Sequence, residues 1–271
     1  MKVKRISLFF VLVFAMVAGN VFAHDKGDLM LNIEPQIGLA FPSIGIVEDG
    51  IKTGDLADMQ TEDNSVGVDY GLRGTVHYYF WSFFGVNAGV GVSGLYRVYT
   101  FEDTVTEEYS DYTYKKLHSN SFDFNLVYIT IPIGFRFSVS ALAVGAGLAI
   151  NIPIVNKSKF WYEYKETRVT NDTGATTEVA KSKSAKESDK DFKANTYLGW
   201  YADIGFDMSG KKGREGGFGM LARFSGSLSD QVAKSKESAL KPYEYKPFSH
   251  FAVSLVFQAA IQLANKPIGG K

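Results

Sequence analysis

The chain contains no cysteine among its 271 residues. Disulfide bonds and thiolate metal sites are therefore excluded, and the fold must be held together by a core or by lipid. No apolar run after the first 23 residues approaches the roughly 20 residues that a membrane-spanning helix needs. Basic and acidic residues are equal in number, at 29 each. A nucleic-acid surface is not predicted, because it would need a basic excess.

Residues 1–23 have the pattern of a secretory signal peptide. A basic start, Lys-Val-Lys-Arg, precedes an almost wholly apolar run over residues 6–17, and small residues lead up to Ala23. The run is shorter than a spanning helix, which favours a cleaved signal over a membrane anchor. We predict cleavage after Ala23, which leaves residues 24–271 as a single exported domain.

Glycine and aromatic residues are abundant, with 27 Gly, 15 Tyr and 21 Phe. Eight segments alternate between apolar residues and small or polar ones, which is the period of a β-strand. The segments cover residues 29–41, 66–80, 84–98, 127–137, 142–152, 192–208, 218–228 and 250–259. Each apolar face can cross a bilayer, since a tilted strand needs about 9–11 residues to do so. The sequence predicts an all-β fold, an eight-stranded antiparallel up-and-down transmembrane barrel.

The links between these segments alternate between short and long. The short links are residues 81–83, 138–140 and 209–217, and the long ones are 42–65, 101–121, 153–191 and 229–247. This alternation predicts short periplasmic turns, flanked by a girdle of aromatic residues, and long extracellular loops. The stretch 157–191 is rich in Lys, Ser, Thr and Glu and has too little apolar surface to order itself. We expect this loop to be solvated and mobile at its tip, with the strands running outward past the membrane through residues 160–162.

Nine ionisable residues fall on the polar face of the predicted strands, which would face the lumen. They are Glu34, Asp69, Arg73, His77, Arg97, Arg136, Asp203, Asp207 and Arg223. An eight-stranded barrel encloses just enough room for side chains, and unpaired buried charge costs several kcal/mol, so opposite charges should pair there. We expect this set to seal the lumen and stiffen the wall; a gated narrow pore or a small-ligand site is the alternative.

Other motifs carry little chemistry. Residues 89–94 match the dinucleotide fingerprint G-x-G-x-x-G, but the glycines lie inside an alternating strand and no helix follows. The four histidines are not at metal-ligand spacing from one another, and His24 beside Asp25 is expected to be a frayed terminus rather than a weak metal site. No catalytic, cofactor-binding or metal-binding residue and no enzyme activity are predicted.

Three segments resemble strands of a known family. Residues 128–137, 143–147 and 222–229 are similar to strand motifs of the outer-membrane β-barrel family loosely termed porin-like, related in architecture to OmpX, the OmpA domain and OmpW. The resemblance implies a barrel in the outer membrane of a diderm bacterium, in a class whose roles vary. Such barrels usually finish on an aromatic residue, whereas here residues 258–271 follow Phe257. Either the last strand runs to about Leu263 or the assembly signal is internal.

Three functions are compatible with these features. The first is a structural or surface-interaction protein that displays long loops at the cell surface. The second is a narrow channel or transporter for small solutes or hydrophobic compounds, and the third is a soluble periplasmic lipocalin-like binder. The expected partners are outer-membrane lipid, the barrel-assembly machinery and an external ligand or host surface, with no nucleic acid and no cofactor.

Overall fold

A computed structural model describes residues 24–42, 46–47, 60–61, 66–139, 141–187, 193–209, 216–231, 244–245 and 250–264. The secondary-structure elements in these ranges are all β-strands, and no helix long and apolar enough to span a membrane is found there. The predicted signal peptide, its cleavage after Ala23 and most of the links 42–65 and 229–247 lie outside the described residues.

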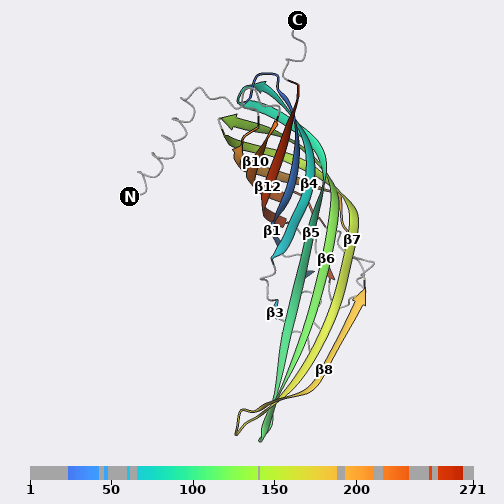
Figure 1. The fold of residues 1–271 in the computed structure, drawn as a ribbon. Helices are drawn as coiled ribbons and strands as arrows, with labels where there is room; N and C mark the ends of the chain where they lie inside the picture. Colours follow the sequence, from blue (N-terminus) through green and yellow to red (C-terminus); the bar gives the residue numbers. More distant parts are fainter. Residues whose placement is uncertain are drawn as a thin grey trace.

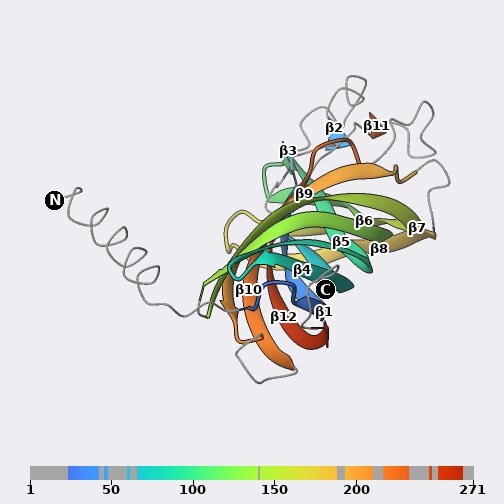
Figure 2. The same cartoon turned by 90° about the horizontal axis from the view of Figure 1, so that it is seen from above.

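Eight strands form a closed antiparallel barrel (Figure 1). Around the barrel they are β1 (Leu29–Pro42), β4 (Gly67–Trp81), β5 (Phe84–Glu108), β6 (Tyr112–Val139), β7 (Leu142–Thr170), β9 (Tyr197–Asp207), β10 (Gly216–Ser227) and β12 (His250–Ala264). The barrel closes because β12 pairs with β1, and the two lie side by side in Figure 2. The predicted eight-stranded antiparallel barrel is confirmed, and its last strand does extend past Leu263.

The outside of the barrel is apolar and the inside is polar. Val90, in the part of β5 that belongs to the barrel, exposes 59% of its surface. Residues of β5 that point into the lumen, such as Ser93 and Arg97, are buried. A soluble barrel has the opposite arrangement, with apolar side chains inside. The observed arrangement is that of a transmembrane β-barrel.

Aromatic rings lie at both ends of the apolar band. At the short turn between β4 and β5, Trp81 stacks on Phe83 with ring centroids 6.0 Å apart. At the opposite end Phe251 contacts three other rings, with centroids 6.2–6.4 Å apart, and these belong to Phe41, Trp200 and Phe224. Such paired girdles mark the two membrane interfaces of transmembrane barrels.

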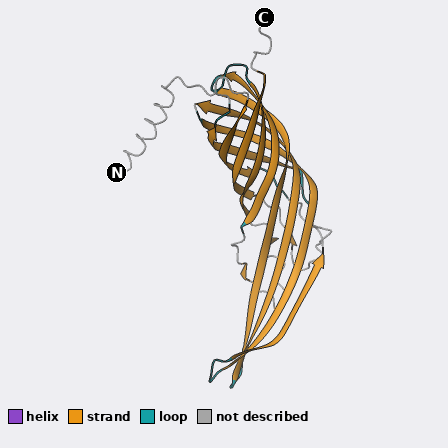
Figure 3. Ribbon diagram, viewed as in Figure 1, coloured by secondary structure: helices purple, strands orange, loops and turns teal. Residues whose placement is uncertain are grey.

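Strands β5, β6 and β7 continue well beyond the barrel, where β8 (Thr176–Glu187) joins them as a fourth strand (Figures 1 and 3). We call this four-stranded sheet the extension; it comprises residues 98–108, 112–125, 156–170 and 176–187. Short strands β2 (Ile46–Val47) and β11 (Glu244–Tyr245) pair with each other, and β3 (Gln60–Thr61) pairs with β5. The links 101–121 and 153–191, predicted as long loops, are therefore mostly strand, and the expected outward run of a strand through residues 160–162 is seen in β7.

Cross-strand pairing explains why a composition so poor in apolar residues forms a sheet here. The backbone groups of β6 and β7 are bonded to neighbours on both sides, and lysines on one strand face glutamates on the next. Lys165 and Glu178 lie 3.7 Å apart, as do Lys181 and Glu163. At the tip, the Asn171 side chain donates to backbone oxygens of the neighbouring turn at 2.9 and 3.1 Å. The two hairpins therefore support each other.

Candidate functional site

The candidate site is the polar interior of the barrel. Successive side chains of a strand point to opposite faces, so the residues between the outward apolar ones project into the lumen. The structure brings the nine sequence-predicted residues to this interior: Glu34 on β1, Asp69, Arg73 and His77 on β4, Arg97 on β5, Arg136 on β6, Asp203 and Asp207 on β9, and Arg223 on β10. Eight are buried, and the Asp203 side chain is 11% exposed.

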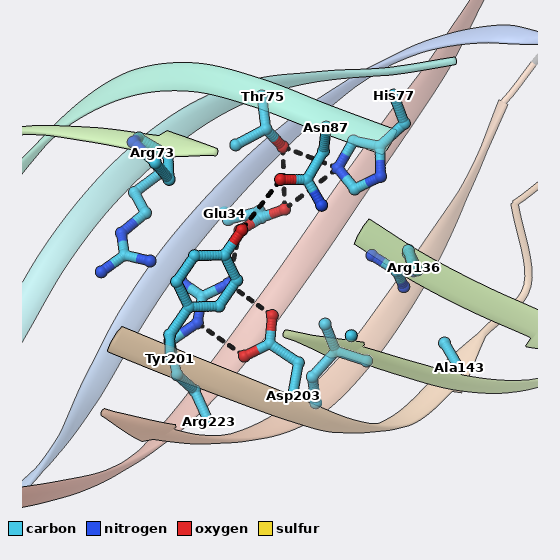
Figure 4. Close-up of a pocket in the computed structure, with 13 residues that line it drawn as sticks. Glu34, Arg73, Thr75, His77, Asn87, Arg136, Ala143, Tyr201, Asp203 and Arg223 are labelled. Atoms are coloured by element: carbon cyan, nitrogen blue, oxygen red, sulfur yellow. Dashed lines mark hydrogen bonds and ion pairs between the residues drawn. The ribbon is translucent and has the colours of Figure 1, made fainter. Parts of the chain in front are cut away.

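Arg223 makes the largest set of contacts in the lumen (Figure 4). Its guanidinium binds the Asp203 carboxylate through two hydrogen bonds of 2.8 Å and donates a third, also of 2.8 Å, to Glu34. A fourth goes to Gln36 Oε1 at 2.9 Å. Such a forked pairing is stronger and more directional than a single charged contact. The contact with Glu34 joins β1 and β10, which are far apart in the sequence.

A second ion pair lies nearer the short-turn end. Arg136 Nη2 is 2.8 Å from Asp207 Oδ2, and Arg136 Nη1 donates to Gln258 Oε1 at 2.8 Å. Asp207 also accepts hydrogen bonds from the backbone and hydroxyl of Ser209. Both charges therefore have partners, as buried charges must if the fold is to tolerate them.

The carboxylates of Glu34 and Asp69 also accept hydrogen bonds from neutral donors. Thr75 donates to Glu34 Oε1 at 2.9 Å and lies 2.9 Å from His77 Nε2. Asp69 accepts from Gln36 Nε2 at 2.9 Å and from Ser254 Oγ at 2.5 Å. These contacts extend the Arg223 cluster to β4 and β12, so the carboxylates are fixed rather than free to bind a passing solute.

Unlike Arg136 and Arg223, Arg73 forms no ion pair with a described residue. Its guanidinium lies 5.6 Å from the centre of the Tyr201 ring, and Arg223 lies 5.3 Å from the same ring. Among the described residues, Arg73 Nε and Nη1 have no hydrogen-bond partner. Arg73 also lines two small cavities, one of about 10 Å³ and one of about 30 Å³. A water molecule needs roughly 10–15 Å³, so this space suits isolated waters that could bond to Arg73.

Sequence reasoning that selects charged residues misses the neutral members of this network. Gln36 and Gln258 accept hydrogen bonds from the arginines, and Tyr201 donates to Asn87 Oδ1 at 2.8 Å. All four lie on the same alternating polar face as the charged residues. Their place on the polar face of an alternating strand is the sequence signal that could have identified them, because they carry no charge.

Residues 24–28, which precede β1, close the short-turn end of the barrel; we call them the cap. The His24 ring stacks on the Tyr79 ring with centroids 3.7 Å apart, and the His24 backbone donates to Ser82 O at 3.3 Å. Gly27 N donates to Tyr79 O at 2.8 Å. Burial lowers the pKa of His24 to about 4. The expectation of a frayed terminus at His24 is therefore wrong.

In the described part of the chain, no group of three or more His, Asp or Glu side chains is arranged to hold a metal. The glycines of the G-x-G-x-x-G match lie in the middle of β5, paired with β4 on one side and β6 on the other. A phosphate-binding glycine turn must instead open a helix. The geometry of the interior therefore supports ion pairs that brace the barrel wall.

No family model and no curated protein matches this chain. Solved structures similar to it include Ail, the attachment invasion locus protein of Yersinia pestis, in complex with the heparin analogue sucrose octasulfate, at 12% identity over 86% of this chain and 99% of that one, with a TM-score of 0.28. The translocator domain of the autotransporter NalP from Neisseria meningitidis is 8% identical over 96% of each chain, with a TM-score of 0.22. The outer membrane protease OmpT of Escherichia coli is 6% identical over 87% of this chain and 97% of that one, at 0.23. Scores this low carry no argument about function, and the fold rests on the strand pairing itself.

Proposed function

We propose that this chain is an outer-membrane protein whose sealed barrel anchors the extension at the cell surface, where the extension contacts an external ligand or host surface. The observation that carries the proposal is the filled lumen. Arg223 and Arg136 are each ion-paired across the interior, and the cavities left beside them are of water size. A lumen in this state supports a structural barrel better than a solute path. No catalytic activity is assigned to the chain.

The extension supports an interaction role because it is a shaped surface rather than a set of loose loops. Its tip carries three tyrosines, Tyr109, Tyr112 and Tyr114, whose ring centroids are 5.0–5.9 Å apart. Tyrosine offers contact area at a low cost in side-chain entropy and is common in binding surfaces. Export, insertion by the barrel-assembly machinery and outward orientation of the extension belong to the same proposal.

Planar-bilayer recording of the purified protein tests the sealed lumen. We expect no stepwise conductance at any applied voltage, and reproducible single-channel steps in the wild-type protein would contradict the proposal. The recording needs no deletion of the extension, because the residues that fill the lumen lie in the barrel. Carbonate extraction of membranes tests insertion, and release of the protein into the wash would contradict it.

A narrow channel is the second candidate, and Arg73 is the observation that favours it. Arg73 lines both small cavities and keeps two nitrogen atoms without a hydrogen-bond partner among the described residues. If conductance appears and Arg73→Ala increases it, the channel replaces the sealed barrel. A soluble lipocalin-like binder does not fit, because the exterior of the barrel is apolar.

A further inference from the structure

The outward face of the sheet changes character over three successive rows where the barrel meets the extension. The first row holds Tyr70, Gly94, Val127 and Val155 on β4, β5, β6 and β7. The second holds Val68, Tyr96, Asn125 and Lys157. The third holds Val98, Asp123 and Lys159 on β5, β6 and β7. Apolar surface therefore gives way to amide and ammonium groups within about two residues of each strand.

This height corresponds to the outer boundary of the apolar band. Ile154 on β7 is 52% exposed and lies just before the first of these lysines. Tyr96 is 40% exposed and belongs to the same row as Lys157. Tyrosine and lysine at the edge of an apolar band are typical of the headgroup level, where a long lysine side chain can reach the polar layer. The groups facing this surface in a bilayer are lipid headgroups.

Tyr70 gives the surface a fixed element. Its ring lies across Gly94, and the Tyr70 hydroxyl donates to Asn125 Oδ1 at 2.8 Å. A Cβ at position 94 would overlap the Tyr70 ring, so this crossing requires glycine there. Because the oxygen of the Asn125 amide accepts the hydrogen bond from Tyr70, its nitrogen is the atom left to donate. The amide is therefore held as a donor.

A hollow of about 600 Å³ lies at the same place and is lined by Tyr96, Asp123, Asn125, Lys157 and Lys159, among others. Lys157 lies opposite the neutral Asn125, whereas Lys159 lies opposite Asp123, which offsets part of its charge. The hollow thus offers two ammonium groups, one of them opposite the Asp123 carboxylate, and one amide donor beside an exposed aromatic ring. That donor set suits a phosphate group attached to an apolar tail.

We propose that Lys157, Lys159 and Asn125 bind the phosphate of an outer-leaflet lipid headgroup, with Tyr96 packed against the start of its acyl region. Lys157 is the main anchor, since its partner on β6 is uncharged. Asn125 is the positioning donor, oriented by Tyr70. The inference rests on the proposed orientation, in which the extension leaves the outer side of the membrane, but not on what the extension contacts or on a sealed lumen.

Native mass spectrometry of the full-length exported protein in detergent tests this site. The probes are bis-phosphorylated lipid A, the same lipid with both phosphates removed, and inorganic phosphate. We expect binding of the phosphorylated lipid, which Lys157→Gln weakens about fivefold and the Lys157→Gln/Lys159→Gln pair weakens further, toward about twentyfold. Asn125→Leu should weaken binding less than Lys157→Gln does.

The matched control is Lys165→Gln/Lys181→Gln, which removes the same charge from the same face of the sheet farther from the barrel. This control should leave binding within twofold of wild type. Equal losses in the control and the Lys157/Lys159 pair would overturn the site in favour of diffuse charge attraction. Equal binding of the dephosphorylated lipid would overturn the phosphate contact, and full competition by millimolar inorganic phosphate would overturn the lipid as its source. Surface labelling of the extension on intact cells checks the orientation separately.

Discussion

Arg223 and Asp203 lie directly opposite each other on β10 and β9, and their side chains meet through two hydrogen bonds of 2.8 Å. A cross-strand pair in register holds its two side chains at a fixed separation, because the ladder sets the distance between the backbones. Glu34 approaches the same guanidinium from β1. One guanidinium thus pairs with two carboxylates contributed by separate strands, and the network depends on it.

Replacing Arg223 should destabilise the barrel strongly. Arg223→Met leaves the charges of Glu34 and Asp203 without their cation, and breaking a buried pair from one side costs about 3–5 kcal/mol. Urea unfolding of the protein refolded into lipid vesicles measures the change in free energy. Lys181→Met is the matched control, since its ion pair with Glu163 is exposed and should be worth less than about 1 kcal/mol. A loss below about 1 kcal/mol for Arg223→Met would refute the bracing role.

A charge placed on the outer face of the barrel should be costly only within the apolar band. Val90 is 59% exposed in the middle of β5, so Val90→Arg is expected to destabilise insertion by about 2–4 kcal/mol. Val179 is 50% exposed on β8 in the extension, and Val179→Arg should be near neutral. Folding titrations into vesicles measure both variants. Equal costs at the two positions would show that the band does not face lipid.

The barrel could be predicted from the sequence because its signal is local. Alternation of period two along residues 66–80 or 142–152 marks both faces of a strand at once, and the same alternation places Glu34 and Arg223 on the lumen face. Which lumen side chains pair is a different matter. Arg223 meets Glu34 across a separation of 189 residues, so the pairing depends on barrel closure and register.

Most of the extension beyond residues 160–162 could not be predicted by local reasoning, for a physical reason. Composition counts the apolar surface that a segment can bury alone, and residues 157–187 have little. Their order comes from pairing with β6, whose own partner is β5, and from cross-strand pairs such as Lys165 with Glu178. The cap was missed in the same way, because stacking of His24 on Tyr79 joins segments 55 residues apart in number but adjacent only in the closed barrel.

Acid should loosen the cap. The pKa of His24 is lowered to about 4 by burial, against 6.5 for the free side chain. Below pH 6.5 the unfolded cap takes up a proton that the docked cap does not, so docking is at full strength above pH 6.5 and weakens as the pH falls toward 4. Hydrogen exchange at the Gly27 amide, corrected for its intrinsic rate, reports docking because Gly27 donates to Tyr79 O. His24→Phe keeps the ring and removes the titration of His24, so its protection should vary less over this range than that of the wild type. The remaining variation would come from Asp28, a cap carboxyl whose pKa is raised by burial. Identical pH dependence in both proteins would exclude His24 as the cause.

Protease access on intact cells should distinguish the two ends of the molecule. A recognition sequence inserted between Asp172 and Thr173 lies in the turn that joins β7 to β8, where Gly174 has a positive φ of 66° and the surrounding side chains are exposed. Short turns face the periplasm in barrels of this architecture, so the link between β9 and β10 lies on the other side of the membrane. We expect cleavage at the first insertion on intact cells, and cleavage at an insertion between β9 and β10 only after the outer membrane is permeabilised.

Digestion should release no fragment from the wild-type extension, because a protease needs a locally unfolded strand and the backbone of β6 and β7 is paired on both sides. Cleavage confined to the link between β9 and β10 on intact cells would invert the topology, and with it the exposure of the extension to the outside.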